Sequence, residues 1–222
     1  MKVWVLIPAY NEEDTLGQIL DELKKKYLSV LVVDDGSWDN TSRIAEDKGV
    51  LVIRNRRNFG KGLSVKRGIR YLLDKENFDY LITMDADNQH SPRDLEKFLK
   101  EAEKGETFVI GNRMNDPRGM PKIRIFTNKL MSWLISKMVR QRIPDTQCGF
   151  RLIKRDVLEK INIETDKYQI ESEILIKAAK KGVNIKSIPI KSIYFKNAKS
   201  KINPIMDTVR FLKFIFFLNE RK

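Results

Sequence analysis

Short apolar segments alternate with longer amphipathic segments through the first half of the chain. The apolar segments predict strands at 3–7, 29–33, 50–53, 79–84 and 107–110. The segments between them predict helices at 12–26, 39–48, 61–74 and 92–103. Strands that are apolar almost throughout, such as Val30-Leu31-Val32-Val33, are typical of a parallel sheet covered by helices on both faces. The pattern therefore predicts an α/β fold with a mainly parallel central sheet.

The regular alternation ends after Gly111. The elements expected beyond it are a basic loop (112–122), an amphipathic helix (123–140), an irregular stretch (143–152), a helix (171–181), a strand pair (184–195) and a last helix (204–219). No internal repeat or low-complexity linker separates the two halves, and 222 residues are an ordinary length for one such domain. We therefore expect a single domain over 1–222.

Two carboxylates, Asp85 and Asp87, follow the apolar strand predicted at 79–84. Ligands of open α/β sheets bind beyond the carboxyl ends of the strands. Carboxylate oxygens suit Mg²⁺ or Mn²⁺, and these ions usually keep coordination positions for substrate phosphates. The pair indicates a metal site used with a diphosphate-bearing donor. An ordinary strand-to-loop junction, or capping of a helix that begins at Ser91-Pro92, would use the same residue types.

Polar loops also follow the first two predicted strands. They read Pro8-Ala9-Tyr10-Asn11-Glu12 and Asp34-Asp35-Gly36-Ser37. An aspartate at a strand end can accept a hydrogen bond from a ribose or from a base N–H. Turn and cap chemistry accounts for Gly36 and Asn40 but leaves the doubled aspartate unexplained. We therefore predict Asp35 as a ligand contact.

The segment Asn58-Phe59-Gly60-Lys61-Gly62 resembles a phosphate-binding loop only superficially. That motif needs a glycine where this chain has Asn55 and a serine or threonine where it has Gly62. A glycine-rich turn that opens the next helix is the simpler interpretation. The helix N-terminus or Lys61 would then lie near the donor. A direct contact and a purely structural turn both remain open.

The chain carries a net charge of +13, from 43 Lys and Arg against 30 Asp and Glu. Such a charge favours an anionic partner, whether nucleic acid, an anionic membrane surface or a phosphorylated substrate. The acidic groups gather at the strand ends of the first half, whereas basic residues dominate 113–142 and 191–222. This distribution predicts metal binding in the first half and phosphate binding in the second.

The compartment is predicted from cysteine use and apolar segments. Cys148 is the single cysteine, so no intramolecular disulfide can form, and we expect it to be a small buried apolar residue. The apolar start at 3–7 is too short for a signal peptide. The apolar tail at 211–218 is interrupted by Lys213 and falls far below the ~20 residues that span a bilayer. We expect a cytoplasmic protein.

Six short motifs form a more specific pattern. They are P-A-Y-N-E at 8–12, V-V-D-D-G-S-W-D-N-T at 32–41, N-F-G-K-G at 58–62, D-A-D-N-Q-H at 85–90, G-N-R at 111–113 and D-T-Q-C-G-F-R at 145–151. Together they resemble the inverting glycosyltransferases of family 2, which have a GT-A fold. Within that family, the last two motifs resemble the dolichyl-phosphate and polyprenyl-phosphate hexose synthases.

The resemblance implies a reaction and a division of the chain. The reaction is metal-dependent transfer, with inversion, of a hexose such as mannose or glucose. The donor would be a GDP- or UDP-sugar and the acceptor a polyprenyl phosphate, dolichyl or undecaprenyl, with Mg²⁺ or Mn²⁺ as cofactor. Residues 1–111 would form the nucleotide-sugar-binding half and 112–222 the acceptor half.

The resemblance also implies a role for each matching residue. The nucleotide-sugar contacts would be Pro8, Ala9, Tyr10, Glu12, Asp35, Lys61, Asp85, Ala86 and Lys201. The metal ligands would be Asp85, Asp87 and Gln89, and the acceptor phosphate would meet Arg113, Arg124 and Asn128. The catalytic set would be Asp87, Arg113, Arg124, Asp145 and Glu173. The segment 196–201 keeps the Ser-Lys of the family's pattern but lacks its Arg and Gly, so a lysine is expected at the leaving diphosphate.

The acceptor class depends on whether a general base is present. A phosphate is already ionised near neutral pH, whereas a hydroxyl acceptor needs a base. Glu171 and Glu173 begin the helix expected at 171–181, either as catalytic carboxylates or as acids favoured by the helix dipole. Asp145 is either a site carboxylate or a turn residue after a proline. Transfer to a hydroxyl of a glycan or lipid is therefore the alternative, and His90 is expected to be a solvated loop histidine.

Two basic amphipathic helices are expected in the second half. The first can place Phe126, Leu130, Trp133, Leu134 and Met138 on one face, and the tail can do the same with Val209, Leu212 and Phe216. Such faces lie on a lipid surface or pack on the sheet. With a lipid acceptor, we expect a protein peripheral at the cytoplasmic face of the membrane, with a separate membrane-anchoring partner as a further option.

Two other classes fit the sequence less well. Sugar nucleotidyltransferases resemble A-G-G-x-G-T-R after the first strand, where this chain has P-A-Y-N-E at 8–12. A non-catalytic protein that binds RNA or a membrane would not need Asp85, Asp87 and Gln89 together. We expect no nucleic-acid partner.

Overall fold

The computed structural model describes residues 1–165, 169–191 and 193. Its strands are β1 (Val3–Ala9), β2 (Ser29–Asp34), β3 (Leu51–Arg54), β4 (Tyr80–Thr83), β5 (Phe108–Asn112), β6 (Arg151–Lys154) and β7 (Lys186–Pro189). Its α-helices are α1 (Glu13–Lys24), α2 (Thr41–Asp47), α3 (Lys61–Lys75), α4 (Leu95–Glu103), α5 (Lys122–Val139), α6 (Arg155–Glu159) and α7 (Ile170–Lys180), and a 3₁₀ turn, η1 (Pro92–Asp94), precedes α4.

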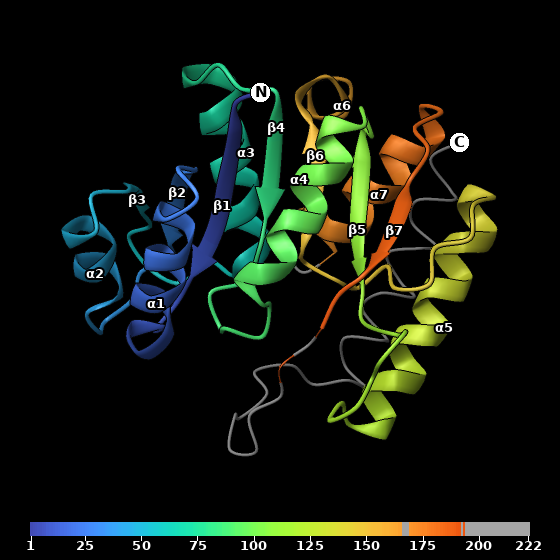
Figure 1. Ribbon diagram of the computed structural model, residues 1–222, viewed down its shortest axis with the longest axis horizontal. Coiled ribbons are helices and arrows are strands. Elements are labelled where there is room, and N and C mark those ends of the chain that lie inside the picture. The colour runs from blue at the N-terminus through green and yellow to red at the C-terminus, as the bar shows by residue number, and fades with distance from the viewer. Residues whose placement is uncertain (166–168, 192, 194–222) are drawn as a thin grey trace.

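The strands form one sheet in the order β3-β2-β1-β4-β6-β5-β7. β6 runs antiparallel to both of its neighbours, β4 and β5, while the other strand pairs are parallel. The mainly parallel sheet predicted from the sequence is confirmed. Because all strands except β6 point the same way, their carboxyl ends meet at the lower edge of the sheet in Figure 1.

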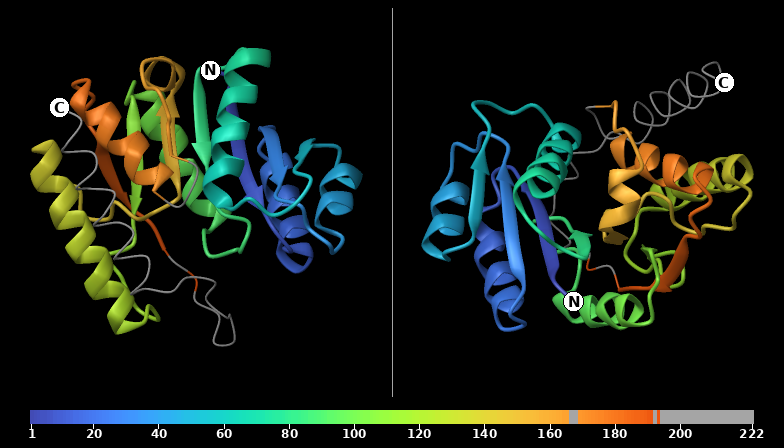
Figure 2. Two further views of the ribbon diagram at one scale, coloured as in Figure 1. Left: turned by 180° about the vertical axis from the view of Figure 1, so that it is seen from behind. Right: turned by 90° about the horizontal axis from the view of Figure 1, so that it is seen from above.

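Helices cover both faces of the sheet, as the apolar strands require. In Figure 2, α1 and α4 lie on one face, and α3, α6 and α7 lie on the other. On α1 the fully buried residues Leu16, Ile19, Leu20 and Leu23 recur at helical spacing, which gives this helix one apolar stripe. The four central residues of β2, at 30–33, are buried almost completely. The site described below is built on this rigid, two-sided core.

The second half departs from the predicted elements. The stretch 143–152 was expected to be irregular, but its last residues begin β6, which inserts between β4 and β5. Only Leu152 and Ile153 are apolar in this strand, so its local pattern is weak and its partners are distant in sequence. The strand pair predicted at 184–195 is a single strand, β7, through its described residues. The helix predicted at 204–219 lies outside the described residues.

The close approach of α3 to β1 generates a testable prediction. A Cβ added at Gly68 would lie 2.3 Å from Leu6 Cδ1, whereas one at Gly17 in α1 would lie 3.4 Å from Ile44 Cγ2. Gly68→Ala should therefore lower the free energy of unfolding by about 1–3 kcal/mol through overpacking, although alanine is the better helix former. Gly17→Ala, the matched control, should raise it by up to about 1 kcal/mol. Urea denaturation measures both, and equal effects would contradict this packing.

Candidate active site

The loops that carry the sequence-predicted residues meet at one edge of the sheet. They follow β1, β2, β4 and β5, and α5 begins at the same lower edge (Figure 1). Thr15 Oγ1 donates to the carbonyl oxygen of Ala86 at 2.6 Å and lies 3.3 Å from Glu12 Oε2. This hydroxyl thus joins the loop after β1 to the loop after β4. The structure brings the predicted nucleotide-sugar contacts at 8–12 beside Asp85.

A three-residue ion cluster stands at the end of β4. Lys61 Nζ lies 2.5 Å from Asp85 Oδ1 and 2.7 Å from Glu171 Oε1. The three side chains come from the start of α3, the loop after β4 and the first turn of α7. They line one cleft together with Pro8, Gly149 and Arg151. Sequence reasoning named Lys61 and Asp85 separately but gave no reason to place them in contact.

The charged groups of this cluster shift one another's pKa values. Burial alone would raise the pKa of Asp85, but the Lys61 ammonium outweighs it and holds the pKa of that carboxyl below its usual range. Burial likewise opposes the charge on Lys61, yet Asp85 and Glu171 together hold the pKa of Lys61 above its usual range. Asp85 and Lys61 are therefore an ionised pair across the neutral pH range.

Asp87 has the opposite electrostatic setting. Burial, and then repulsion from Asp85, raise the pKa of Asp87 above its usual value. Its Oδ1 accepts a hydrogen bond of 3.0 Å from the backbone N–H of Gln89. Asn88, between these residues, has a φ of 55°, so the backbone turns tightly after the D-x-D motif. The loop thus holds two carboxylates close enough for each to disfavour the other's charge.

These residues fit the divalent cation that the motif implies. The described residues contain no cluster of three His, Cys, Asp or Glu side chains that could hold a metal ion. Mg²⁺ and similar ions, however, often take only one or two carboxylates and complete their shell with water and substrate phosphates. Burial and then Asp85 raise the pKa of Asp87, so a bound cation would favour its ionised form. Asp85, Asp87 and Gln89 are the residues that would hold it.

His90 differs from the sequence-based expectation. It is buried rather than solvated, with 2% of its surface exposed, and its ring stacks on Phe150 at a centroid distance of 5.2 Å. The backbone N–H of Asp85 donates a hydrogen bond of 3.4 Å to His90 Nδ1. Burial lowers the pKa of His90, which favours the neutral ring. A histidine between the polar residues Gln89 and Ser91 gives no local signal of such burial.

Asp35 organises the loop before α3. Its Oδ1 accepts hydrogen bonds from Asn55 Nδ2 at 2.7 Å and from the Phe59 N–H at 3.1 Å, and its Oδ2 accepts from the Gly60 N–H at 2.7 Å. Gly36, with a φ of 75°, leaves no room for a Cβ, which would lie 2.5 Å from the carbonyl carbon of Arg57. The doubled aspartate therefore has a structural use, whether or not Asp35 also meets a nucleoside.

On the acceptor side, Arg113 and Asp145 form a buried ion pair. Arg113 Nε lies 2.7 Å from Asp145 Oδ2 and Nη2 lies 2.9 Å from Oδ1, with 4% and 0% of the two residues exposed. Burial alone would raise the pKa of Asp145, but the guanidinium outweighs it and keeps the pKa below its usual range. Both residues were predicted in the catalytic set, and the structure places them against each other.

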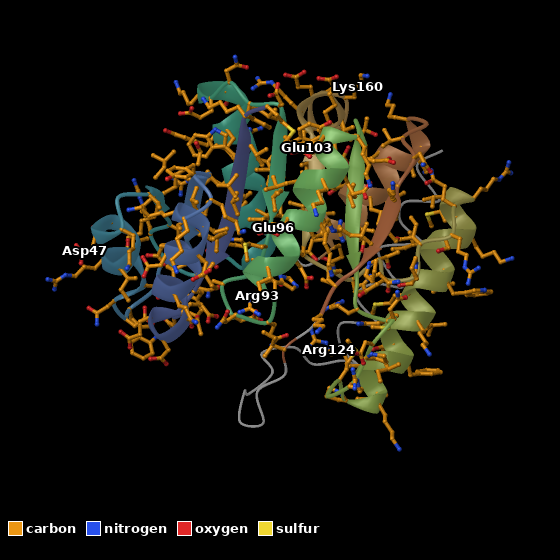
Figure 3. The ribbon with its side chains drawn as sticks, in the orientation of Figure 1. Asp47, Arg93, Glu96, Glu103, Arg124 and Lys160 are labelled. Carbon is orange, nitrogen blue, oxygen red and sulfur yellow. The ribbon has the colours of Figure 1, made fainter. Side chains whose placement is uncertain are left out.

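Arg124 and Asn128 lie one turn apart on α5. Arg124 is half-buried near the beginning of the helix, at the same lower edge of the molecule as the D-x-D loop (Figure 3). Asn128 is 7% exposed, and its Nδ2 lies 4.0 Å from Met120 Sδ. Of the predicted acceptor residues, Arg124 is thus the one on the more open surface. Lys201, predicted at the diphosphate, lies outside the described residues.

The two glutamates at the start of α7 have different surroundings. Glu173 is 1% exposed, accepts hydrogen bonds from the N–H groups of Glu164 and Thr165 at 2.8 Å each, and lies 2.7 Å from Lys177 Nζ. Glu171, not Glu173, reaches the cleft. The i,i+4 pairing of Glu173 with Lys177 was a sequence signal for this internal role.

Arg151 is a residue that sequence reasoning missed. It is 1% exposed, and it donates to the backbone carbonyl oxygens of Cys148, Thr146 and Glu171. It thereby ties the start of α7 to the loop 146–150. Cys148 is buried, as predicted, and burial raises the pKa of its thiol to about 12. The motif D-T-Q-C-G-F-R contains both residues, but their contacts are non-local.

One face of α5 is exposed and apolar. The residues that form this α5 stripe are Ile123, Phe126 and Trp133, with 52%, 64% and 57% of their surface exposed. Lys122, Lys129 and Lys137 are also exposed on this helix. Of the helices in the described part of the chain, none is both long and apolar enough to cross a bilayer.

Residues 4–162 match the family Glycosyl transferase family 2. The chain belongs to this family. A protein of unassigned function from Methanocaldococcus jannaschii is 38% identical to this chain. The match covers 90% of this chain and 85% of the length of the relative. The undecaprenyl-phosphate mannosyltransferase of Micrococcus luteus is 32% identical over 91% of this chain and 88% of its own. This family 2 protein is thus a glycosyltransferase.

Solved structures support the fold independently. The glucosyl-3-phosphoglycerate synthase of Mycobacterium tuberculosis, in complex with Mn²⁺ and UDP-glucose, superposes with a TM-score of 0.74 at 19% identity. The match covers 94% of this chain and 75% of the synthase. The predicted GT-A fold is confirmed.

Proposed function

We propose that this glycosyltransferase transfers a hexose, with inversion and with the help of a divalent cation, from a nucleotide-sugar to a polyprenyl phosphate. The main support for a phosphate acceptor is that the carboxylates predicted as a general base already have cationic partners within the protein. Asp145 pairs with Arg113, and Glu173 caps a loop beside Lys177. The pKa of each lies below its usual range, although burial acts against this. Neither is a good proton acceptor at neutral pH.

An acceptor that is already ionised removes the need for such a base. Glu171, the remaining acidic candidate from the sequence, forms an ion pair with Lys61. A phosphate monoester is anionic near neutral pH and can attack without losing a proton. The Micrococcus luteus relative is named for an undecaprenyl-phosphate acceptor, which supports the same chemistry. Transfer to a hydroxyl acceptor has no comparable observation in its favour.

Donor activation follows from the charges at the end of β4. Cleaving the bond between sugar and diphosphate builds negative charge on the leaving group. Asp85 and Asp87 would hold a cation that neutralises this charge when it is bound. Lys61 stands at the same place and would add a second positive group. Preorganised charges of this kind contribute about 3 kcal/mol each, or about a hundredfold in rate.

The acceptor phosphate would be held by Arg124, the half-buried cation near the start of α5. Asn128 lies one turn further along α5, and Arg113 is held by its ion pair with Asp145. A planar guanidinium suits a phosphate because it can donate two parallel hydrogen bonds. Arg124 therefore has the chemistry and the position for this role.

The α5 stripe would bring the enzyme to its lipid acceptor. Exposed Phe and Trp side chains, interspersed with lysines, are typical of helices that lie in a membrane interface. Anionic lipid headgroups would add about 1 kcal/mol for each basic residue near the surface. We therefore place the enzyme at the cytoplasmic face of the membrane as a peripheral protein, with or without an anchoring partner.

Asp87→Ala should abolish transfer. With labelled GDP- and UDP-hexoses as donors and undecaprenyl or dolichyl phosphate as acceptor, the rate should fall by at least about a hundredfold, because a cation ligand is lost. Thermal unfolding should remain cooperative. Asp47→Ala, at an exposed position on α2 (Figure 3), is the control and should be unaffected. Near-normal transfer by Asp87→Ala would contradict the proposal. So would transfer by the wild type to hydroxyl acceptors but not to polyprenyl phosphate.

Arg124→Ala should weaken use of the acceptor more than binding of the donor. The KM for polyprenyl phosphate should rise by about tenfold or more, which corresponds to the loss of a charge-assisted hydrogen bond. The dissociation constant of the nucleotide-sugar should change little. Arg140→Ala, just beyond the other end of α5, is the control. Equal losses for donor and acceptor would refute the assigned role.

Replacing the aromatic residues of the α5 stripe should reduce membrane binding. Co-sedimentation with vesicles that contain anionic lipid should fall several-fold for the double variant Phe126→Ser/Trp133→Ser, since buried apolar area is lost. The activity on a short-chain, water-soluble acceptor should persist. Tyr27→Ser removes an even more exposed aromatic residue beyond the end of α1 and serves as control. Unchanged sedimentation of the double variant would rule out this surface.

A further inference from the structure

Lys61 occupies an unusual position for a lysine. It is the first residue of α3, where the helix dipole is positive and a basic side chain is unfavourable. No acidic residue stands in this first turn. Two carboxylates from other elements, Asp85 and Glu171, compensate by meeting the ammonium at 2.5 and 2.7 Å. The position of Lys61 is therefore determined by tertiary charge pairing and not by helix preference.

The backbone around Lys61 is fixed on both sides of the cluster. Gly60, the preceding residue, has a φ of 99°, and its N–H donates to Asp35 Oδ2. Across the cleft, a Cβ at Gly149 would lie 3.0 Å from both Lys61 Nζ and Asp85 Oδ2 and 3.1 Å from Glu171 Oε1. A side chain at this position would crowd the three charged groups. The cluster is thus a built arrangement and not a chance surface contact.

The ammonium uses an oxygen that a cation would need. Asp85 Oδ1 is bonded to Lys61, and Asp85 Oδ2 lies against Gly149. A divalent cation that binds Asp85 through Oδ1 must displace the ammonium or share that oxygen with it. The ammonium and the divalent cation repel each other at one carboxylate unless a further anionic group binds beside them.

We propose that Lys61 and the divalent cation compete for Asp85, so that the protein alone holds the cation weakly and takes it up together with a nucleoside diphosphate. The diphosphate supplies the negative charge that allows both cations to occupy the cleft. Glu171 keeps the ammonium at the cleft after Asp85 has been given up. Lys61 is a positioning residue in this scheme, since it controls when the cation binds. The inference rests on the metal-dependent function proposed above.

A titration of the full chain with Mn²⁺ tests the competition without turnover. Electron paramagnetic resonance of the free ion measures how much Mn²⁺ is bound. In the absence of nucleotide, Lys61→Gln should bind Mn²⁺ at least about tenfold more tightly than the wild type, because a like charge next to the ion is removed. Lys75→Gln, which removes an exposed lysine from the last residue of the same helix, should bind like the wild type. Addition of UDP or GDP should narrow the difference between Lys61→Gln and the wild type.

A double-mutant cycle assigns the effect to Asp85. In the Asp85→Asn background, Lys61→Gln should give no gain, because the contested oxygen no longer carries charge. A gain that persists in this background would overturn the competition and indicate long-range repulsion only. Circular dichroism reports whether each variant folds. Lys61→Met, which keeps the length of the side chain, replaces Lys61→Gln if that variant does not fold.

The outcomes separate this inference from the proposed function. Equal Mn²⁺ affinity of wild type and Lys61→Gln, together with metal-dependent transfer by the wild type, would overturn the inference alone. Absence of Mn²⁺ binding in every variant, with or without UDP or GDP, would overturn the metal-dependent function and the inference with it. A gain in Lys61→Gln that is lost in the Asp85→Asn background would support the competition.

Discussion

The repulsion between two carboxylates at the end of β4 is the constraint around which the site is arranged. Asp85 and Asp87 sit in one tight, partly buried loop, and each makes the charge of the other more costly. Folding places them there because β4 lies between β1 and β6 in the sheet and ends at the edge where the other loops meet. One of the two charges is balanced internally by Lys61. The other would be balanced by the divalent cation proposed for this loop.

In the second half of the chain, two buried carboxylates are instead satisfied within the protein. Asp145 and Glu173 each have a cationic partner and several donors, so they fix backbone and side chains rather than accept protons. Arg151 extends this order by binding three backbone carbonyl oxygens and so holds Glu171 in place. Carboxylates that are already paired, together with the half-buried cation Arg124, suit the anionic acceptor proposed above.

Much of this arrangement was predictable because it depends on local patterns. Continuous apolar runs identified β1 to β5, and the D-x-D motif identified the site at the end of β4. The insertion of β6 was not predictable, since Leu152 and Ile153 are too few to mark a strand and its partners lie far away in the sequence. The burial of His90 against Phe150 and the contact of Glu171 with Lys61 also depend on non-local neighbours. Residue types identified the chemistry, but pairing decided which carboxylate faces the cleft.

The position of a bound cation would test this account most directly. Anomalous diffraction from crystals of the protein grown with Mn²⁺ and a nucleoside diphosphate locates the ion without reference to activity. The account predicts one peak in the loop after β4, in contact with Asp87 and with an oxygen of the diphosphate. A nucleotide bound with no peak beside Asp85 and Asp87, or with the ion held elsewhere, would contradict it.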